Sequence, residues 1–175
     1  MTQFKWHEAD SKNVHGIADT ADLILSGGAA GGMLTGNYPN PTLSMSPITN
    51  SLSADVALNN TALYFDGPSV AQGSVGTWFV SGTVSLTQAS PVNNSQFEVK
   101  LWDGTTVIAS ALAIPAGTGA AGTSLWISVS LSGYIAAPAG NLRISVRDIV
   151  NTTGAIKYNG TGTGKDSTIT ALRIA

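Results

Sequence analysis

Cysteine is absent from the 175-residue chain, and charged residues make up only 10% of it. The first absence excludes disulfides, Cys-ligated zinc and a thiol nucleophile; the second lies well below the roughly 25% of ordinary soluble domains. The net charge of −2 argues against a nucleic-acid partner. No run approaches the roughly 18 apolar residues of a membrane span, and the first residues lack the apolar stretch of a signal peptide. We therefore expect a protein made in a cytosol, with no membrane partner.

The first 50 residues differ in composition from the rest. Residues 23–50 carry no charged side chain and contain two Gly-Gly pairs and three prolines. Paired glycines fix no conformation, and proline prevents helix, so we expect at most two turns of helix, within residues 17–25. The sequence predicts an extended, mostly irregular arm over residues 1–50 with no core of its own.

Apolar and aromatic side chains are too frequent in this arm for a plain linker, which would be rich in Gly, Ser and Pro alone. Two interpretations remain, a disordered tail or an arm that becomes ordered on another chain, and the apolar anchors favour the second. The residues expected to contact that partner are Trp6, Leu23, Ile24, Leu25, Met33, Leu34, Tyr38, Pro39, Pro41 and Leu43.

From about residue 51 the apolar residues alternate with polar ones. This period of two is typical of half-buried strands, and it occurs over residues 51–58, 80–86, 97–102, 125–131 and 142–147. Gly, Pro, Asn and Asp separate these segments, as expected of turns. The sequence predicts eight or nine strands without a long helix, which form an antiparallel β-sandwich of jelly-roll type over residues 51–175.

The pair Asp103-Gly104 predicts a hairpin within this sandwich. Asp-Gly suits a two-residue type I′ turn, in which both central residues have positive φ. We expect this turn to connect strands over residues 96–102 and 105–114.

The segments that resemble enzyme motifs lack residues or spacings that those motifs require. The segment 160–165 resembles a phosphate-binding loop, but Asn159 replaces its first glycine and Asp166 replaces the Ser or Thr that holds magnesium. His7 and His15 lack the spacing of a zinc helix. The carboxylates available for a catalytic pair are expected near turns or facing outward, where they solubilise the chain; they are Asp55, Asp66, Glu98, Asp103, Asp148 and Asp166. We predict a non-enzymatic protein with no cofactor and no metal.

Trp102 and Trp126 are out of phase with the expected core residues of their strands. A large apolar side chain on the outer face of a sheet usually marks a contact surface. These two residues are candidates for a subunit interface or for stacking on sugar rings. We expect few charges around them, which favours the interface, and three wedge-shaped sandwiches can close around one axis as a homotrimer.

Two segments of the arm carry a family resemblance. Residues 15–23, His-Gly-Ile-Ala-Asp-Thr-Ala-Asp-Leu, resemble a stretch common near the start of bacteriophage fibre-like proteins. Residues 32–43, Gly-Met-Leu-Thr-Gly-Asn-Tyr-Pro-Asn-Pro-Thr-Leu, are similar to the Gly-x-Leu-x-Gly-x-Tyr-Pro-Asn-Pro-Thr segment of phage fibres and related virion proteins. Residues 54–175 resemble the β-sandwich knobs of phage virion components in style.

The resemblance implies a trimeric, non-enzymatic structural protein of a virion assembled in the host cytoplasm. Its arm would bind the major capsid protein or another virion protein. The length suits a head fibre or a capsid decoration (cement) protein better than a tail fibre, which needs a long shaft. The alternative is a receptor-binding tail-fibre or tail-tip knob that recognises a host-surface glycan; a glycan-active enzyme on the same fold has no supporting site.

Overall fold

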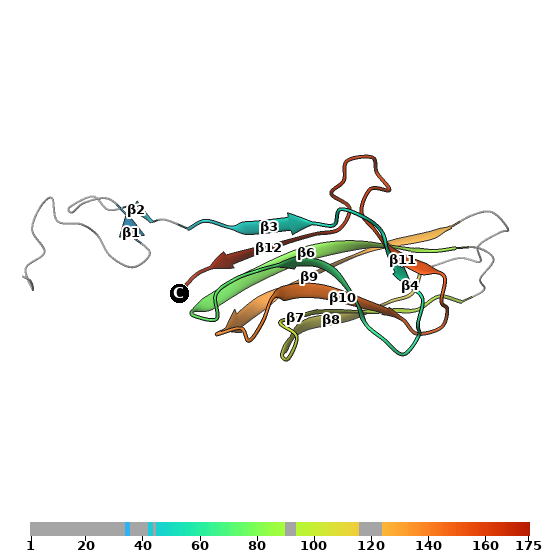
Figure 1. Cartoon of the computed structure of the whole chain (residues 1–175), viewed down its shortest axis with the longest axis horizontal. Coiled ribbons are helices and arrows are strands. Elements are labelled where there is room, and N and C mark those ends of the chain that lie inside the picture. Colours follow the sequence, from blue (N-terminus) through green and yellow to red (C-terminus); the bar gives the residue numbers. More distant parts are fainter. Residues whose placement is uncertain (1–33, 36–41, 44, 90–93, 116–123) are drawn as a thin grey trace, which may run out of the picture. The chain divides into compact units, whose positions relative to one another are not determined.

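The computed structural model describes residues 34–35, 42–43, 45–89, 94–115 and 124–175 (Figure 1). Contacts between Cα atoms divide the chain into two units, residues 1–44 and 45–175. In the described ranges, no helix is long and apolar enough to cross a membrane.

The described part of the arm is a short pair of strands. β1 (Leu34–Thr35) pairs antiparallel with β2 (Thr42–Leu43), with Leu34 opposite Leu43. The sequence did not predict this pairing. The short helix expected within residues 17–25 lies outside the described residues, and so do the expected partner contacts Trp6, Leu23, Ile24, Leu25, Met33, Tyr38, Pro39 and Pro41.

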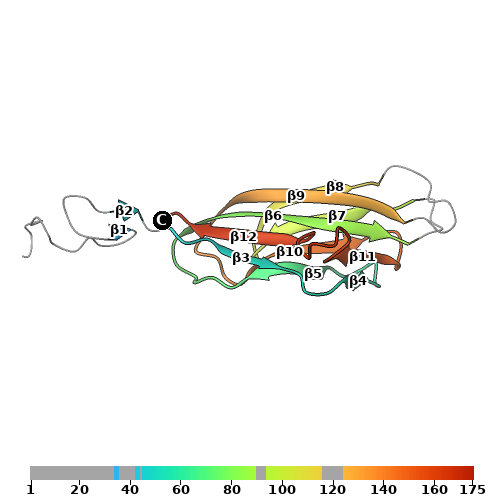
Figure 2. The ribbon, with the colours of Figure 1, turned by 90° about the horizontal axis from the view of Figure 1, so that it is seen from above.

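The second unit is built from two antiparallel sheets. The four-stranded sheet has the order β5 (Phe65–Val70), β10 (Leu142–Asp148), β7 (Phe97–Trp102) and β8 (Val107–Ala113). The six-stranded sheet contains β3 (Ile48–Ser51), β12 (Thr168–Arg173), β6 (Thr77–Gln88), β11 (Gly154–Lys157), β4 (Val56–Leu58) and β9 (Leu125–Ala136). Figures 1 and 2 show the two layers.

The connections between the sheets confirm the jelly-roll prediction. From β4 to β7 the chain changes sheet at every step, and it does so again from β8 to β11. Such alternation produces the two interlocked layers of a jelly roll. Everything after residue 51 that the structure describes is strand, turn or loop, as the sequence predicted.

The core lies between the sheets and follows the predicted alternation. Side chains from the inner faces of both sheets form this core. The fully buried apolar side chains come from β4 (Leu58), β6 (Val80, Val84, Leu86), β7 (Phe97, Leu101), β10 (Leu142, Ile144, Val146), β11 (Ile156) and β12 (Ile169, Ala171). At about 25 cal/mol per Å² of buried apolar surface, this layer supplies most of the stabilising free energy.

The single strand expected over residues 51–58 is wrong. Its two ends belong to different strands, because β3 pairs with β12 while β4 pairs with β11. The residues between them leave the sheet. Asp55 instead accepts a hydrogen bond from the backbone N of Tyr158 at 3.0 Å and pairs with Lys157. This side-chain contact determines the path of the chain here more than the local alternation of apolar and polar residues does.

The hairpin between β7 and β8 is confirmed, but its turn is longer than predicted. The loop comprises residues 103–106 and closes with a hydrogen bond from Asp103 N to Thr106 O at 3.2 Å. Gly104 has a φ of +97°, which glycine adopts without strain. The reason for the longer turn is the Asp103 carboxylate, which is only 3% exposed and accepts backbone hydrogen bonds from Thr105, Thr106 and Ala139.

We expect Asp103→Ala to lower the free energy of unfolding by about 2–4 kcal/mol, because three backbone N–H groups lose a charged acceptor. Burial would raise the pKa of Asp103, but the N–H groups of Thr106, Ala139 and Thr105 outweigh it and hold the pKa below the usual value. Because the pKa is lower in the folded chain, this stabilisation exists above about pH 4 and disappears as the pH falls through the folded pKa. Urea unfolding between pH 2 and 7 checks both statements.

Asp103→Asn is the matched control for that series, because it keeps one side-chain oxygen. At pH 7 its free energy of unfolding should fall less than that of Asp103→Ala. On acidification it should lose less stability than the parent chain does. Equal stability of Asp103→Ala and the parent chain would contradict the role of the carboxylate.

Candidate functional site

Trp102 and Trp126 lie on opposite sheets. Trp102 ends β7 in the four-stranded sheet, and Trp126 lies near the start of β9 in the six-stranded sheet. Both point away from the core, as predicted, but they cannot belong to one contact surface on a single copy. The two outer faces must therefore be considered separately.

Over β3, β12, β6 and β9, all of which the structure describes, the outer face of the six-stranded sheet carries no charged side chain of its own. We call this surface the neutral face. Its residues are mostly Ser and Thr, with aromatic groups at both ends: Thr49, Ser51, Thr77, Phe79, Ser81, Thr83, Ser85, Thr87, Trp126, Ser128, Ser130, Ser132, Tyr134, Ala136, Thr168, Thr170 and Leu172. Trp126 is 52% exposed and Tyr134 is 67% exposed. Two lysines lie at the border of the neutral face: Lys157 of β11 is opposite Ser85, and Lys165 of the β11–β12 loop donates to Ser51 Oγ at 3.3 Å.

The hydroxyl groups of the neutral face pair across the strands. Thr83 and Ser130 are joined by a hydrogen bond of 2.8 Å, and Thr49 and Thr170 by one of 2.9 Å. The same pattern joins two further pairs, Ser85 with Ser128 and Ser51 with Thr168. Much of the polar surface is therefore already hydrogen-bonded within the sheet.

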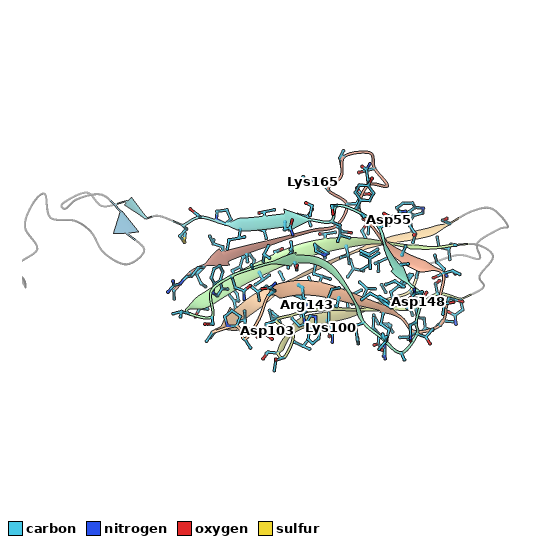
Figure 3. All side chains as sticks on the ribbon, in the orientation of Figure 1. Asp55, Lys100, Asp103, Arg143, Asp148 and Lys165 are labelled. Atoms are coloured by element: carbon cyan, nitrogen blue, oxygen red, sulfur yellow. The ribbon has the colours of Figure 1, made fainter. Side chains whose placement is uncertain are left out.

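The loop between β11 and β12 borders this face next to Trp126. A Cβ placed on Gly160 would lie 2.4 Å from the Trp126 ring, so a larger residue there would require the half-exposed indole to move. The Asp166 carboxylate is buried and accepts a backbone hydrogen bond from Thr161 at 2.9 Å. The carboxylate thus closes the loop from within. Figure 3 shows Lys165 on this projecting loop.

The outer face of the four-stranded sheet is charged, and we call it the charged face. Five of the 18 charged residues of the chain gather there: Asp66, Glu98, Lys100, Arg143 and Arg147. Figure 3 shows Lys100 and Arg143 beside each other on this sheet. This arrangement corrects the expectation that few charges surround Trp102.

Trp102 is held in this network by both its ring and its nitrogen. Its Nε1 donates to Ser145 Oγ at 2.6 Å, and Ser145 Oγ donates to Asp66 Oδ1 at 2.5 Å. Lys100 Nζ lies 3.4 Å from the centre of the indole ring, and the Arg143 guanidinium lies 4.8 Å from it. Cations therefore cover the ring, which removes Trp102 as a free stacking platform for sugars.

Tyr64 and Glu98 form the other half of the network. Tyr64 donates its hydroxyl to Glu98 Oε2 at 2.7 Å, and Arg147 donates to the same oxygen at 2.6 Å. These hydrogen bonds lower the pKa of Glu98, against the smaller effect of burial. Burial and the adjacent Glu98 raise the pKa of Tyr64. Glu98 is therefore ionised and Tyr64 neutral at physiological pH.

Lys100 sits between the two aromatic rings, 3.9 Å from the centre of Tyr64 and 3.4 Å from that of Trp102. Burial lowers its pKa, Arg143 and Arg147 lower it further, and Asp66 opposes them. The ion pairs of the described residues join Arg143 to Asp66, Arg147 to Glu98 and Lys157 to Asp55, and none of them includes Lys100. Lys100 is therefore held over the two aromatic rings rather than in an ion pair.

A cleft of about 420 Å³ opens beside Lys100 on the charged face. Its lining combines a phenol, a carboxylate and a hydroxyl with apolar groups: Tyr64, Glu98, Val99, Ser110, Ala111 and Leu112. In the register of β7 with β8, Lys100 lies opposite Ser110 and Glu98 opposite Leu112. The cleft thus has a mixed polar and apolar lining, in which Glu98 is the one charged residue.

The carboxylates do not behave as the sequence suggested. Asp103, Asp148 and Asp166 are buried rather than exposed. Each accepts backbone hydrogen bonds, and Asp103 and Asp148 lie toward opposite ends of the sandwich (Figure 3). They stabilise loops. The described residues contain no group of three or more His, Asp or Glu suited to a metal ion.

Sequence reasoning missed Tyr64, Lys100, Arg143 and Arg147 as members of one site. A signal was present, because Glu98, Lys100 and Trp102 alternate outward on one strand and Arg143, Ser145 and Arg147 on another. Only the pairing of β7 with β10 shows that these two rows are neighbours.

Comparisons with known proteins identify no family and only distant similarities to solved structures. No protein-family model and no curated protein matches this chain. Among solved structures, Eiger TNF from S. frugiperda shares 11% identity over 75% of this chain and 93% of that chain, with a TM-score of 0.46. The C-terminal CBM6 of the laminarinase LamC from Zobellia galactanivorans shares 17% over 73% and 100%, with a TM-score of 0.37.

A viral protein is also among these structures. The infectious bursal disease virus VP2 subviral particle shares 11% identity, with a TM-score of 0.31, over 83% of this chain and 37% of that chain. With TM-scores below 0.5, these likenesses support no functional conclusion for this chain.

The phenol of Tyr64 offers a direct test of the charged network. We expect its pKa to lie above the usual value of about 10, and to fall toward that value in Glu98→Gln, which removes the neighbouring negative charge. An NMR titration of labelled tyrosine, with Tyr64→Phe to identify the signal, measures both. Asp55→Asn removes a carboxylate outside the network and should leave the titration unchanged. An identical Tyr64 titration in Glu98→Gln and the parent would contradict the contact.

Proposed function

We propose that this protein is a non-enzymatic structural component of a virion that assembles as a homotrimer and decorates the capsid shell through its N-terminal arm. The observation that carries the assembly step is the neutral face. Surfaces of soluble proteins usually carry about 25–35% charged residues that oppose association, whereas this face has none over four described strands.

The hydrogen bonding of the neutral face favours its burial against another copy. Burying an unpaired hydroxyl costs about 1–3 kcal/mol, but hydroxyl pairs such as Thr83 with Ser130 are already bonded within the sheet. Trp126 and Tyr134 gain most from burial, because each exposes more than half of its side chain. In a trimer one part of this face packs against a different part of the same face on the next copy. Both parts bring bonded hydroxyls, and the nearest ammonium group, that of Lys165, lies at the border of the face.

The virion setting rests on the arm. Residues 15–23 and 32–43 resemble the attachment segments of phage fibre-like proteins, and extended chain laid across a subunit boundary resists its opening. Three arms per trimer would bind the shell with higher avidity than one. The major capsid protein is the partner that this role requires.

The alternative function, a receptor-binding knob for a host-surface glycan, loses one of its two stacking candidates. Lys100 and Arg143 cover the ring of Trp102. Trp126 keeps an exposed ring, but it lies on the neutral face. We therefore assign it to the subunit interface.

The trimer predicts a mass of about three times 17.8 kDa in sedimentation equilibrium at micromolar concentration. Ser132→Arg places a charge on an exposed position of the neutral face and should shift the protein toward the monomer. Ser53→Arg adds the same charge at an exposed loop position and should leave the trimer intact. A monomeric parent chain, or equal dissociation in both variants, would overturn the interface.

Decoration predicts that particles carrying the protein release DNA at a higher temperature than particles without it. Each bound trimer stabilises the intact shell by RT ln(1 + [L]/Kd), about 2.7 kcal/mol at a hundredfold excess over Kd. The fragment 45–175, which lacks the arm, should give no such shift, although it keeps the whole sandwich. Unchanged DNA release together with lost adsorption to cells would support the glycan-binding alternative instead.

A further inference from the structure

We propose that two copies of this chain join antiparallel through the free edges of their β9 strands, with Ser130 of each copy at the centre of the contact. Their six-stranded sheets then form one continuous sheet. The contact uses backbone groups at a sheet edge rather than the side chains of the neutral face. It therefore does not depend on the trimer, and it would link one trimer to another.

β9 has one edge paired and one edge free. Throughout the part of the chain that the structure describes, it pairs with β6 alone, and it lies along one margin of the sandwich (Figure 2). The backbone N of Ala137 donates to Gly76 O at 2.8 Å, which continues the register in which Ala136 is opposite Thr77. Because hydrogen-bonded pairs alternate along an antiparallel ladder, the odd-numbered residues of β9 bond to β6. The even-numbered residues, from Trp126 to Ala136, therefore direct their N–H and C=O groups to the free edge.

This free edge lacks the features by which proteins prevent strand addition, namely charges, prolines, bulges and short length. The other edge strands of the two described sheets each have at least one of them. β5 contains Asp66 and Pro68, β3 and β4 have four and three residues, and β8 has a register shift in its pairing with β7. β9 runs for 12 residues in unbroken register without a charge or a proline. Such an edge favours pairing with another strand.

The large side chains of β9 contact their own copy and leave the free edge open. The Tyr134 ring lies 5.1 Å from that of Phe79 on β6, and a Cβ on Gly160, in the β11–β12 loop, would lie 2.4 Å from the Trp126 ring. Between these two rings the exposed side chains of residues 128–132 are all serine. Small side chains allow a second strand to approach the free edge closely.

A second copy is the partner that fits this edge. An edge without charges is best matched by another long, uncharged and unpaired strand, and among the described edge strands β9 itself has these properties. Antiparallel pairing centred on Ser130 places the even-numbered residues of both copies opposite one another, so that each free N–H meets a free C=O. Ser128 then lies opposite Ser132 of the partner subunit, and Trp126 opposite Tyr134 of the partner subunit. No like charges face each other across the pair.

The absence of cysteine makes disulfide crosslinking a direct test. In the proposed register the Cα atoms of the two Ser130 residues lie about 5.5 Å apart, within the range of about 4.4–6.8 Å that a disulfide requires. Ser130→Cys at high protein concentration in a glutathione redox buffer should therefore give a disulfide-linked dimer on a non-reducing gel.

The register provides the matched controls. Ser128→Cys alone and Ser132→Cys alone should each give at least about tenfold less dimer, because the two identical cysteines would lie four positions apart, about 13 Å along the strand. A mixture of these two variants should link, because residue 128 of one copy faces residue 132 of the other. Burial of the neutral face against another copy does not predict this combination.

Ser132→Pro, introduced together with Ser130→Cys, blocks the edge without charging the neutral face. Because residue 132 is even-numbered, proline removes an N–H that points to the free edge and none that bonds to β6. The disulfide-linked dimer should fall at least about fivefold. Ser132→Ala keeps the N–H and should leave linking unchanged. Urea unfolding verifies that each variant is folded.

The outcomes separate the edge contact from the trimer. Absence of dimer in Ser130→Cys, equal dimer in Ser132→Cys alone, or unchanged linking with Ser132→Pro would overturn the edge contact. The fragment 45–175 should link as the full chain does; loss of linking would assign the free edge to the arm and would also overturn it. A parent chain that sediments as a trimer but stays unlinked as Ser130→Cys retains only the trimer. A monomeric parent whose Ser130→Cys variant links retains only the edge contact.

Discussion

The rest of the sandwich depends on the register of β6. This strand pairs with β9 over its whole length, from Thr77 opposite Ala136 to Gln88 opposite Leu125, and its other edge holds β12 and then β11. Because side chains alternate with a period of two, a slip by one residue would turn the buried Val80 and Leu86 outward and bring the hydroxyl row into the core. One strand therefore defines both the core and the neutral face.

Close packing at the middle of β6 reinforces this constraint. A Cβ on Gly82 would lie 2.7 Å from the carbonyl oxygen of Thr168 and 2.8 Å from Ile144 Cδ1. The neighbouring strand β12 and the facing strand β10 can both approach the sheet there because glycine has no side chain. Ile144 belongs to β10, whose opposite face carries Arg143 and Arg147. The strand that packs against the middle of β6 is therefore the same strand that positions the charged face.

The sequence predicted the parts of this fold that depend on local alternation. The strands over 80–86, 97–102 and 142–147 and the outward direction of Trp126 are confirmed, since each needs only the period of two. The features that were missed depend on residues far apart in the chain. The turn after β7 is four residues long because the Asp103 carboxylate reaches Ala139, 36 residues away. The surroundings of Trp102 likewise depend on Ser145, which only strand pairing brings near.

The two outer faces differ most in charge. On the neutral face the hydroxyls are bonded to one another, so covering them removes few hydrogen bonds to water. On the charged face the ion pairs Arg143–Asp66 and Arg147–Glu98 surround Lys100, which lies over the rings of Tyr64 and Trp102. Burying such charges against an apolar surface is costly, which favours the neutral face over the charged face for the proposed contact between copies. Because β6 and β7 belong to different sheets of the sandwich, covering the neutral face would leave the charged face open to solvent.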